Sequence, residues 1–380
     1  MNFKLSEEHL MIRDAAREFA QTELLPGVIE RDNLQQFPAE QVKKMGEMGF
    51  LGMMVNPEFG GGGMDTLSYV LVMEELSKID ASSSVIVSVN NSLVCYGLQA
   101  YGSMAQKDKY LRPLATGEAL GAFCLSEPEA GSDATSQKTT AIDHGDHYLL
   151  NGTKNWITNG SSANYYIVIA QTDKQKGHRG INAFIVEKDM EGFSIGPKED
   201  KLGIRGSDTH SLMFHNVKVP KENRIGEDGF GFKFAMKTLS GGRIGIAAQA
   251  LGIASGAYEL ARDYSKIRTA FGKEIYKHQA ISFKLADMYT QIEAARHLVY
   301  KAAWEKDNGI NYDRSSAVAK LYASQVAMDT AVEAVQVHGG NGFVKEYHVE
   351  RLMRDAKITQ IYEGTSEIQK IVISRALLED

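Results

Sequence analysis

A glutamate near the C-terminal end of the chain stands in a setting suited to acid–base chemistry. Glu363, in IYEGTSEIQ (361–369), is followed by Gly364, Thr365 and Ser366, which disfavour a helix interior although helix-like sequence runs on both sides. Gly364 permits a tight turn that directs the carboxylate into a pocket, where it can act as a general base and leave backbone N–H groups free for a ligand. Thr365 and Ser366 are predicted to cap the next helix.

Two upstream segments have the composition of a cofactor site. The loop FCLSEPEAGSD (123–133) is rich in hydroxyl and backbone N–H donors that suit a phosphate or a flavin ring edge, although alone it reads as an ordinary turn. In NWITNGSS (155–162), Trp156 lies beside Thr158 on an expected strand. Its ring offers a flat stacking surface, although tryptophan more often belongs to a core.

Two more segments of this kind lie at the ends of expected helices. In RTAFGK (268–273), Arg268 can pair with a phosphate, the alternative being a solvated loop arginine. QVHGGNGF (336–343) has three glycines in four residues, where one would be enough to end a helix. The additional glycines favour a close approach of the backbone to a ligand.

Common catalytic and metal-binding patterns are missing from the sequence. It has no HExxH, GxSxG, Walker or GxGxxG pattern, which argues against a nicotinamide cofactor on a Rossmann unit. Its two cysteines, Cys95 and Cys124, are expected to be free and buried, so neither a disulfide framework nor a sulfur-ligated metal is predicted. The glycines of NPEFGGGGMD (56–65) are interpreted as a flexible surface loop.

The composition is that of a globular protein too long for a single core. The chain has 380 residues, of which 43% are hydrophobic and 24% charged, so two or three domains are expected. A formal net charge of -6 argues against nucleic-acid binding. The N-terminus has no secretory signal and no run of 18 apolar residues occurs, so we predict a soluble, cytoplasmic protein without a membrane span.

Helices are expected at both ends of the chain. Ser6 is the predicted N-cap of the first, and Pro26 lies beyond its end. No proline follows Pro220, which favours long helices in the C-terminal part. Apolar periodicity predicts helices at 39–48, 66–79, 233–266, 276–307, 314–337, 348–356 and 366–378.

The middle of the chain is rich in β-forming segments. They cover 165–172, 182–188 and 211–220, and Asn151-Gly152 between two apolar runs predicts a hairpin. The fold class is therefore mainly α with a central antiparallel β domain of barrel type. We expect an N-terminal helical domain (1–121), a middle β domain (122–232) and a C-terminal helical domain of four-helix-bundle type (233–380).

These motifs also resemble those of a known family. CLSEPEAGSDATS (124–136) and QVHGGNGFVKEYHVERLMRD (336–355) closely resemble the two signature regions of acyl-CoA dehydrogenases, FAD enzymes that desaturate acyl-CoA thioesters. RTAFGK and IYEGTSEIQ stand at the expected places, so the resemblance covers essentially the whole chain. It implies the same three-domain order, a homotetramer with FAD held partly by a neighbouring subunit, and an electron-transferring flavoprotein as electron acceptor.

The resemblance also implies roles for individual residues. At the flavin ring it places Phe123, Leu125, Ser126, Gly131, Ser132, Trp156, Ile157 and Thr158. At the pyrophosphate and adenosine end, across the subunit interface, it places Arg268, Phe271, Gln279, Gln336, Val337, His338, Gly339 and Gly340. Thr365 and Glu367 are implied to contact the cofactor, and Ser132, Arg243 and Gly364 to bind the substrate. No metal is expected.

Glu363 aligns with the family's catalytic base. In relatives for branched or long acyl chains the base stands on the first C-terminal helix, at the position of Gly245 here, so only Glu363 remains. The base removes an α-proton while a β-hydride passes to flavin N5, which gives a trans-2-enoyl-CoA. Burial between flavin and acyl chain is expected to raise its pKa from roughly 4.3 towards 6–7.

The resemblance is closest to short-chain, butyryl-type enzymes and favours straight acyl-CoA of C4 to C6. Gln249 and Thr359 match positions where short-chain members narrow the acyl pocket, the alternative being polar groups satisfied at helix ends. Ser240 stands where family members commonly carry an aspartate, so the resemblance does not extend to this part of the CoA contact. The alternatives are a branched- or medium-chain dehydrogenase, an acyl-CoA oxidase, which commonly carries a longer C-terminal extension, or a catalytically silent flavoprotein binding module on the same fold.

Overall fold

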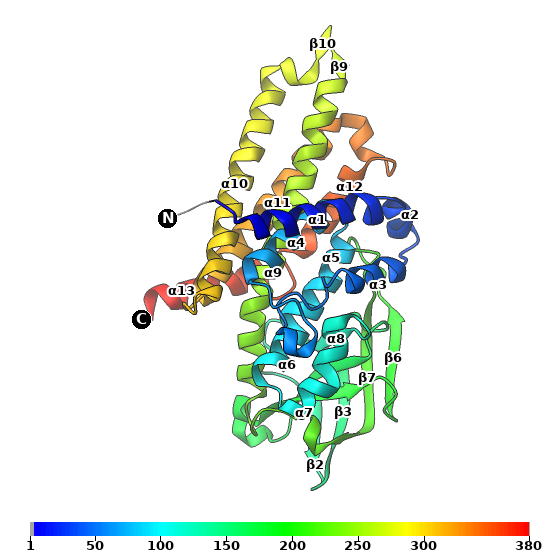
Figure 1. Ribbon diagram of the computed structural model, residues 1–380, viewed down its shortest axis with the longest axis vertical. Coiled ribbons are helices and arrows are strands. Elements are labelled where there is room, and N and C mark those ends of the chain that lie inside the picture. The colour runs from blue at the N-terminus through cyan, green and yellow to red at the C-terminus, as the bar shows by residue number, and fades with distance from the viewer. Residues whose placement is uncertain (1–3, 380) are drawn as a thin grey trace.

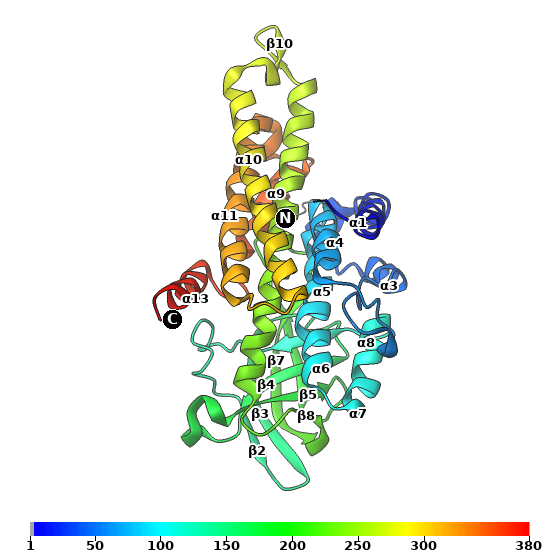
Figure 2. The same ribbon diagram turned by 60° about the vertical axis from the view of Figure 1, so that its left-hand side comes forward.

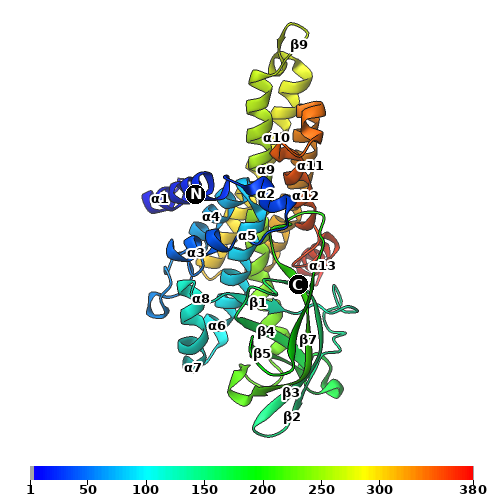
Figure 3. The ribbon, with the colours of Figure 1, turned by 90° about the vertical axis from the view of Figure 1, so that its right-hand side faces the viewer.

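Three groups of elements make up the structure, a computed structural model that describes residues 4–379. Long helices run along the molecule, a β-sheet covers one end of them, and the N-terminal helices pack against their side (Figure 1). Figure 2 shows α1 and α3 on one side of the long helices and the last helix, α13, on the other, and Figure 3 agrees. The predicted order of helical, β and helical parts is confirmed.

The N-terminal part contains short helices around one longer one. They are α1 Glu7–Phe19, α2 Val28–Asn33, α3 Ala39–Glu47, α4 Thr66–Ile79, α5 Ala81–Ser88, α6 Tyr96–Tyr101, α7 Met104–Gln106 and α8 Arg112–Thr116, with π-helical turns at 20–24, 89–95 and 107–111. Ser6 caps α1 as predicted, because its Oγ accepts from the His9 N–H at 3.2 Å. The helices predicted at 39–48 and 66–79 are confirmed within one residue.

Helices α5 to α8 were not predicted from the sequence. Every residue from Ala81 to Cys95 is buried, so this stretch has no polar face and no helical period of hydrophobicity. The glycine-rich loop after Pro57 also differs from the expectation of a flexible loop. Its backbone N–H groups at Gly62 and Gly63 donate to Gly52 and Val55 at 3.0 and 2.8 Å, and it is thereby held against the protein.

The middle part is a sheet whose strands follow the order β6-β7-β3-β2-β4-β5-β8, with β1 paired to β4. The strands are β1 Gly121–Cys124, β2 Thr140–Asp143, β3 His147–Thr158, β4 Tyr165–Gln171, β5 Ile181–Glu187, β6 Phe193–Lys198, β7 Thr209–Pro220 and β8 Arg224–Ile225. Most pairings are antiparallel as predicted, but β1 and β2 pair with β4 in parallel. Among the described residues no pairing joins β6 to β8, so the sheet does not close into a hydrogen-bonded barrel.

The hairpin predicted at Asn151-Gly152 is wrong. Strand β3 continues through both residues, and its register with β7 shifts between Leu150 and Gly152. Gly152 has φ +148°, and a Cβ built there would lie 2.4 Å from Thr139 Oγ1. The glycine therefore serves a β-bulge and a close strand contact, which need the same conformational freedom as a turn.

The C-terminal part consists of helices that match their predicted ranges closely. They are α9 Gly231–Ile267, α10 Gln279–Asp307, α11 Asp313–His338, α12 His348–Ile358 and α13 Ser366–Leu378, and a two-stranded hairpin, β9 Thr269–Ala270 and β10 Lys273–Glu274, joins α9 to α10. Helix α9 is long and apolar enough to cross a membrane by length and composition, but 83% of its most apolar window is buried inside the protein. It packs against α4, α10 and α11 as the central helix of the fold.

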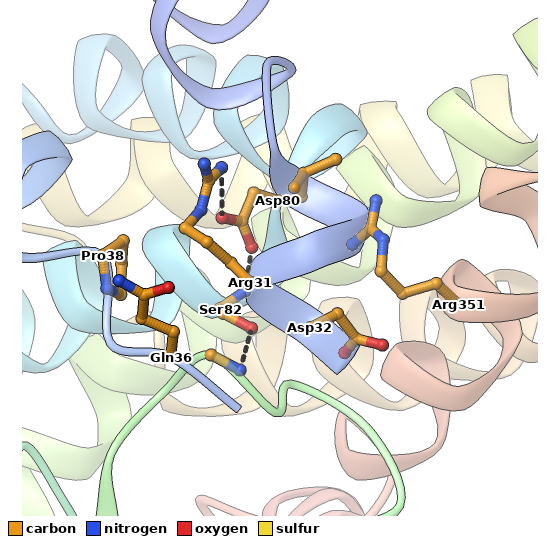
Figure 4. Close-up of a pocket in the computed structure, with 9 residues that line it drawn as sticks. Arg31, Asp32, Gln36, Pro38, Asp80, Ser82 and Arg351 are labelled. Atoms are coloured by element: carbon orange, nitrogen blue, oxygen red, sulfur yellow. Dashed lines mark hydrogen bonds and ion pairs between the residues drawn. The ribbon is translucent and has the colours of Figure 1, made fainter. Parts of the chain in front are cut away.

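A buried cluster of charges joins all three parts close to α12 (Figure 4). Asp80, the N-cap of α5, pairs with Arg31 of α2 at 3.7 Å and accepts from the Ser82 N–H at 2.9 Å. The Ser82 hydroxyl in turn accepts from the N–H of Gly206, which lies in the loop before β7, at 3.2 Å. From α12, Arg351 donates to the carbonyl of Ile79. The space among these groups is too small for a water molecule. The cluster therefore packs tightly, and the bond from Arg351 fixes α12 to the N-terminal part.

Candidate active site

The segment between α12 and α13 forms a tight loop that presents Glu363. Helix α12 ends at Ile358, and α13 starts after Thr365, whose Oγ1 accepts from the Ile368 N–H at 3.3 Å. Glu363 and Gly364 have φ of +52° and +93°, both in the left-handed region. The predicted turn at Gly364 and the predicted cap at Thr365 are confirmed. A non-glycine residue in this conformation costs free energy and is common at functional sites.

The side chain of Glu363 is aimed at helix α9. The residue as a whole is partly exposed, but its Oε2 atom is buried and has no hydrogen-bond partner. A Cβ built on Gly242 would lie 2.1 Å from this atom, so only a glycine at that position leaves room for the carboxylate. Burial raises the pKa of Glu363 to about 7, while the positive charges of Lys320 and Arg243 lower it.

Gln249 and Thr359, predicted to lie at the acyl pocket, both make hydrogen bonds within the protein. Gln249 of α9 donates to the Ala81 carbonyl at 2.9 Å and to Ser84 Oγ at 3.0 Å, and it accepts from the hydroxyl of Tyr362. Gln249 thus links α9, α5 and the Glu363 loop. Thr359 donates to the Ala356 carbonyl at 2.7 Å, which is an ordinary helix-end contact. Both side chains are therefore satisfied, in agreement with the alternative interpretation of these positions.

The loop 123–133 lies beside the exposed part of strand β3. The Asn155 N–H donates to the Ser126 carbonyl at 2.9 Å, next to Trp156, whose side chain is 62% exposed. Trp156 has φ +61° at a shift in the β3–β7 register. An exposed indole beside a loop of backbone donors is suited to stacking on a planar ring.

A buried ion pair fixes the loop 123–133 to strand β3. Lys154 is fully buried, and its Nζ donates to Glu127 Oε1 at 2.7 Å, to the Leu125 carbonyl at 2.9 Å and to Gln137 Oε1 at 3.1 Å. Glu127 also accepts from the Lys138 N–H at 2.6 Å. The pair was not predicted, since nothing local in the sequence marks Lys154 as buried.

We expect Glu127→Ala to lower the unfolding free energy by about 3–5 kcal/mol, because it leaves the buried Lys154 charge unpaired. The matched control is Glu129→Ala in the same loop. Glu129 pairs with Lys138, and both side chains are more than 60% exposed, so a loss below about 1 kcal/mol is expected. Chemical denaturation measures both variants, and equal midpoints would show that the buried pair does not anchor the loop.

A separate cavity of about 580 Å³ lies where α9 and α11 end and α10 begins. Of the predicted cofactor residues it is lined by Arg268, Phe271, Val337, His338, Gly339 and Gly340. Phe271 is 97% exposed at the tip of the β9–β10 hairpin. Gln279 and Gln336 are exposed and are not among the residues lining the cavity.

The predicted cofactor residues thus form two groups that one chain does not bring together. The hairpin with Phe271 is at the end of the molecule opposite the sheet (Figures 1 and 3). Gly242, which faces Glu363, and Arg268 are 26 residues apart along α9 and its end, which corresponds to roughly 39 Å. Glu367 is exposed at the start of α13, and Gly131 and Ser132 are exposed in their loop.

Arg243, predicted to bind the substrate, lies close enough to Glu363 for its positive charge to lower the pKa of that carboxyl. Its side chain is buried, and its Nε has no hydrogen-bond partner. Sequence reasoning missed several residues around the site: Tyr69, Lys154, Lys320, Tyr362 and Gln369. Within residues 4–379, no group of three or more His, Cys, Asp or Glu side chains could hold a metal ion. Cys95 and Cys124 are free and buried, as predicted.

Three family models together match nearly the whole chain. They describe the N-terminal domain (residues 6–118), the middle domain (122–217) and the C-terminal domain (229–378) of acyl-CoA dehydrogenases. The chain belongs to the acyl-CoA dehydrogenase family. Members of this family are flavin-dependent oxidoreductases.

Individual acyl-CoA dehydrogenases are similar over their full length. The short-chain-specific acyl-CoA dehydrogenase of Clostridium acetobutylicum is 52% identical, covering 98% of this chain and 99% of that protein. The butyryl-CoA dehydrogenase structure of Megasphaera elsdenii has a TM-score of 0.98 at 50% identity and covers both chains completely. A chain from structural work on the electron-transferring flavoprotein of Acidaminococcus fermentans and flavin-based electron bifurcation has a TM-score of 0.99 at 52% identity, again with complete coverage of both.

Proposed function

We propose that this acyl-CoA dehydrogenase desaturates short-chain acyl-CoA thioesters with Glu363 as the catalytic base. One observation carries the proposal: a carboxylate that is buried, unpaired and raised in pKa to about 7 stands on a left-handed loop against α9. A base with a pKa near the working pH combines the deprotonated state with a useful affinity for the proton. The full-length similarity to short-chain and butyryl-CoA enzymes supports the substrate class.

The loop supplies more than a base. Within the described residues, the backbone N–H groups of Glu363 and Gly364 have no hydrogen-bond acceptor, whereas both carbonyl groups are bonded. A thioester oxygen placed at such N–H groups is stabilised when α-proton removal makes it negative, an effect of roughly 3 kcal/mol per donor. Glu363 would take the α-proton, and a flavin bound opposite it would supply the acceptor for the hydride that leaves the β-carbon.

The packing around Gly245 supports Glu363 as the position of the base. A Cβ built on Gly245, the alternative position on α9, would lie 2.3 Å from the Tyr69 hydroxyl and 2.7 Å from Ser88 Oγ. A glutamate therefore does not fit there without moving α4 or the Tyr69 side chain. This geometry favours the short-chain reading over the branched- and long-chain alternatives.

FAD is the proposed cofactor, held between two subunits. The exposed Trp156 and the loop 123–133 suit its ring, and the cavity with Arg268 and the glycines of 339–340 suits a pyrophosphate. Because these two groups lie far apart in one chain, the flavin beside Glu363 of one subunit would meet Arg268 of another. This is the physical argument for an assembly of at least two subunits, and the homotetramer is proposed from the family resemblance. The domain limits 1–121, 122–232 and 233–380 and the cytoplasmic location also stay proposals.

An electron-transferring flavoprotein is the proposed electron acceptor. The similar chain from Acidaminococcus fermentans comes from work on such a flavoprotein, which supports an assignment of this kind.

A rate series across acyl chain lengths tests the substrate class. With FAD-loaded enzyme and an artificial electron acceptor, we expect kcat/KM to be highest for straight C4 or C6 acyl-CoA and to fall for C8, C12 and isobutyryl-CoA. The expectation rests on the full-length similarity to short-chain-specific and butyryl-CoA dehydrogenases. An optimum at C8 to C12 would contradict the short-chain assignment.

A further inference from the structure

A buried lysine holds the loop that carries Glu363. Lys320 is on α11, and its side chain is completely shielded from solvent. Its Nζ donates to the Gly364 carbonyl at 2.6 Å, which is the one hydrogen bond of this ammonium group among the described residues. Placing a lysine charge in a protein interior costs several kcal/mol. A buried lysine that binds only a backbone carbonyl therefore points to a role beyond stability.

Gln369 contributes to the same hold from α13. It is fully buried, and its Nε2 donates to the Gly364 carbonyl at 2.9 Å and to the Glu363 carbonyl at 3.2 Å. The carbonyl groups of residues 363 and 364 are therefore both turned towards α11 and α13. Since each peptide plane is rigid and trans, this orientation turns the N–H groups of Gly364 and Thr365 away from α11 and α13.

We propose that Lys320, assisted by Gln369, is a positioning residue of the desaturation reaction. It binds the Gly364 carbonyl, keeps the left-handed Glu363–Gly364 turn in place, and so holds the base against Gly242 with the loop N–H groups free for the thioester oxygen. The inference rests on the proposed function, because a positioning role has meaning only if Glu363 is the base. It adds a residue that neither the motifs nor the cofactor clusters indicate.

The positive charge of Lys320 also acts on the pKa of Glu363. Around Glu363 the charged or titratable neighbours are Lys320 from α11, Arg243 from α9, Tyr69 from α4 and Tyr362 from the loop itself. Burial lowers the pKa of Lys320 to about 8, with attraction from Glu363, repulsion from Arg243 and a further attraction from Glu367. Lys320 is thus mainly cationic at neutral pH, and its charge favours the ionised form of Glu363.

The direct test compares Lys320→Met with Lys320→Arg in the FAD-loaded enzyme, using butyryl-CoA over pH 5.5 to 9. Methionine fills a similar volume without charge or donor. We expect the high-pH plateau of kcat/KM to fall about 10²-fold as the loop loosens. The acid limb should move up by about one pH unit, because the loss of the cation raises the pKa of Glu363. Lys320→Arg should keep the acid limb close to that of the wild type.

Lys301→Met on α10 is the matched control, since this lysine is 62% exposed and pairs only with Glu305. It should behave as the wild type. If Lys320→Met fails to retain flavin, Gln369→Leu tests the positioning role instead. It removes the hydrogen bonds to the carbonyls of Glu363 and Gly364 but keeps the positive charge of Lys320. That variant should lose plateau rate without moving the acid limb.

The outcomes separate this inference from the proposed function. A wild-type enzyme that does not oxidise any acyl-CoA would refute the function itself. An active wild type with a Lys320→Met variant of unchanged plateau and acid limb would overturn the positioning role alone. So would a Lys320→Arg variant whose acid limb moved as far as that of Lys320→Met, or a Gln369→Leu variant with the wild-type plateau.

Discussion

Glu363→Gln should abolish turnover while the protein still folds and binds FAD and butyryl-CoA. The amide has nearly the same shape as the carboxylate but cannot accept the α-proton, and loss of a general base typically costs about 10²–10⁴-fold in rate. Folding should be unaffected or slightly improved, because the carboxylate is buried without a hydrogen-bond partner. Steady-state rates with an artificial electron acceptor measure the effect, and visible absorbance measures the bound flavin.

Glu40→Gln provides the control for this prediction. Glu40 is exposed at the start of α3, away from the loop, and the substitution should leave the rate unchanged. A Glu363→Gln variant within tenfold of the wild-type rate would mean that another group removes the proton.

Gly242→Ala should have the second-largest effect, through the position of the base. The added Cβ would lie 2.1 Å from Glu363 Oε2 and 2.7 Å from Leu93 Cδ2, so the carboxylate must move away from α9. A displacement of about 1 Å at a reacting group can cost about 10²-fold in rate. The protein itself should still fold, because the nearest clashing atom ends a side chain that can turn aside.

Gly241→Ala, one residue earlier on α9, is the matched control. A Cβ there would meet only Lys306 Nζ at 3.9 Å and the Ser92 carbonyl at 4.0 Å, which is ordinary van der Waals contact. Both variants gain the same helix propensity, about 0.5–1 kcal/mol, so any difference in kcat/KM reports the contact with Glu363. Equal rates for the two variants would refute the role of Gly242 as the space for the base.

Local signals in the sequence were enough for most of the helical framework. Helix α13 and its cap follow from Thr365 and the apolar period after it, and α4 follows from the apolar period of residues 66–79. These signals work because capping and amphipathicity act over a few neighbouring residues. The motif order then identified the family and with it the candidate base.

Other features depend on contacts that no local pattern records. The buried run 81–95 has no polar face, so its helical period was invisible. Gly152 correctly indicated an unusual backbone conformation. The predicted hairpin was wrong because this conformation serves a β-bulge beside a neighbouring strand. Lys320 is 44 residues from the carbonyl it binds, and a lone lysine on a helix is most often solvated.

Anaerobic mixing with butyryl-CoA tests the central claim most directly, because it isolates the step in which Glu363 acts. Purified enzyme should be yellow, and its long-wavelength flavin absorbance should bleach on adding butyryl-CoA, whereas the Glu363→Gln variant should keep its colour over the same time. A wild-type protein that never binds flavin, or a Glu363→Gln variant that bleaches at the wild-type rate, would contradict the account.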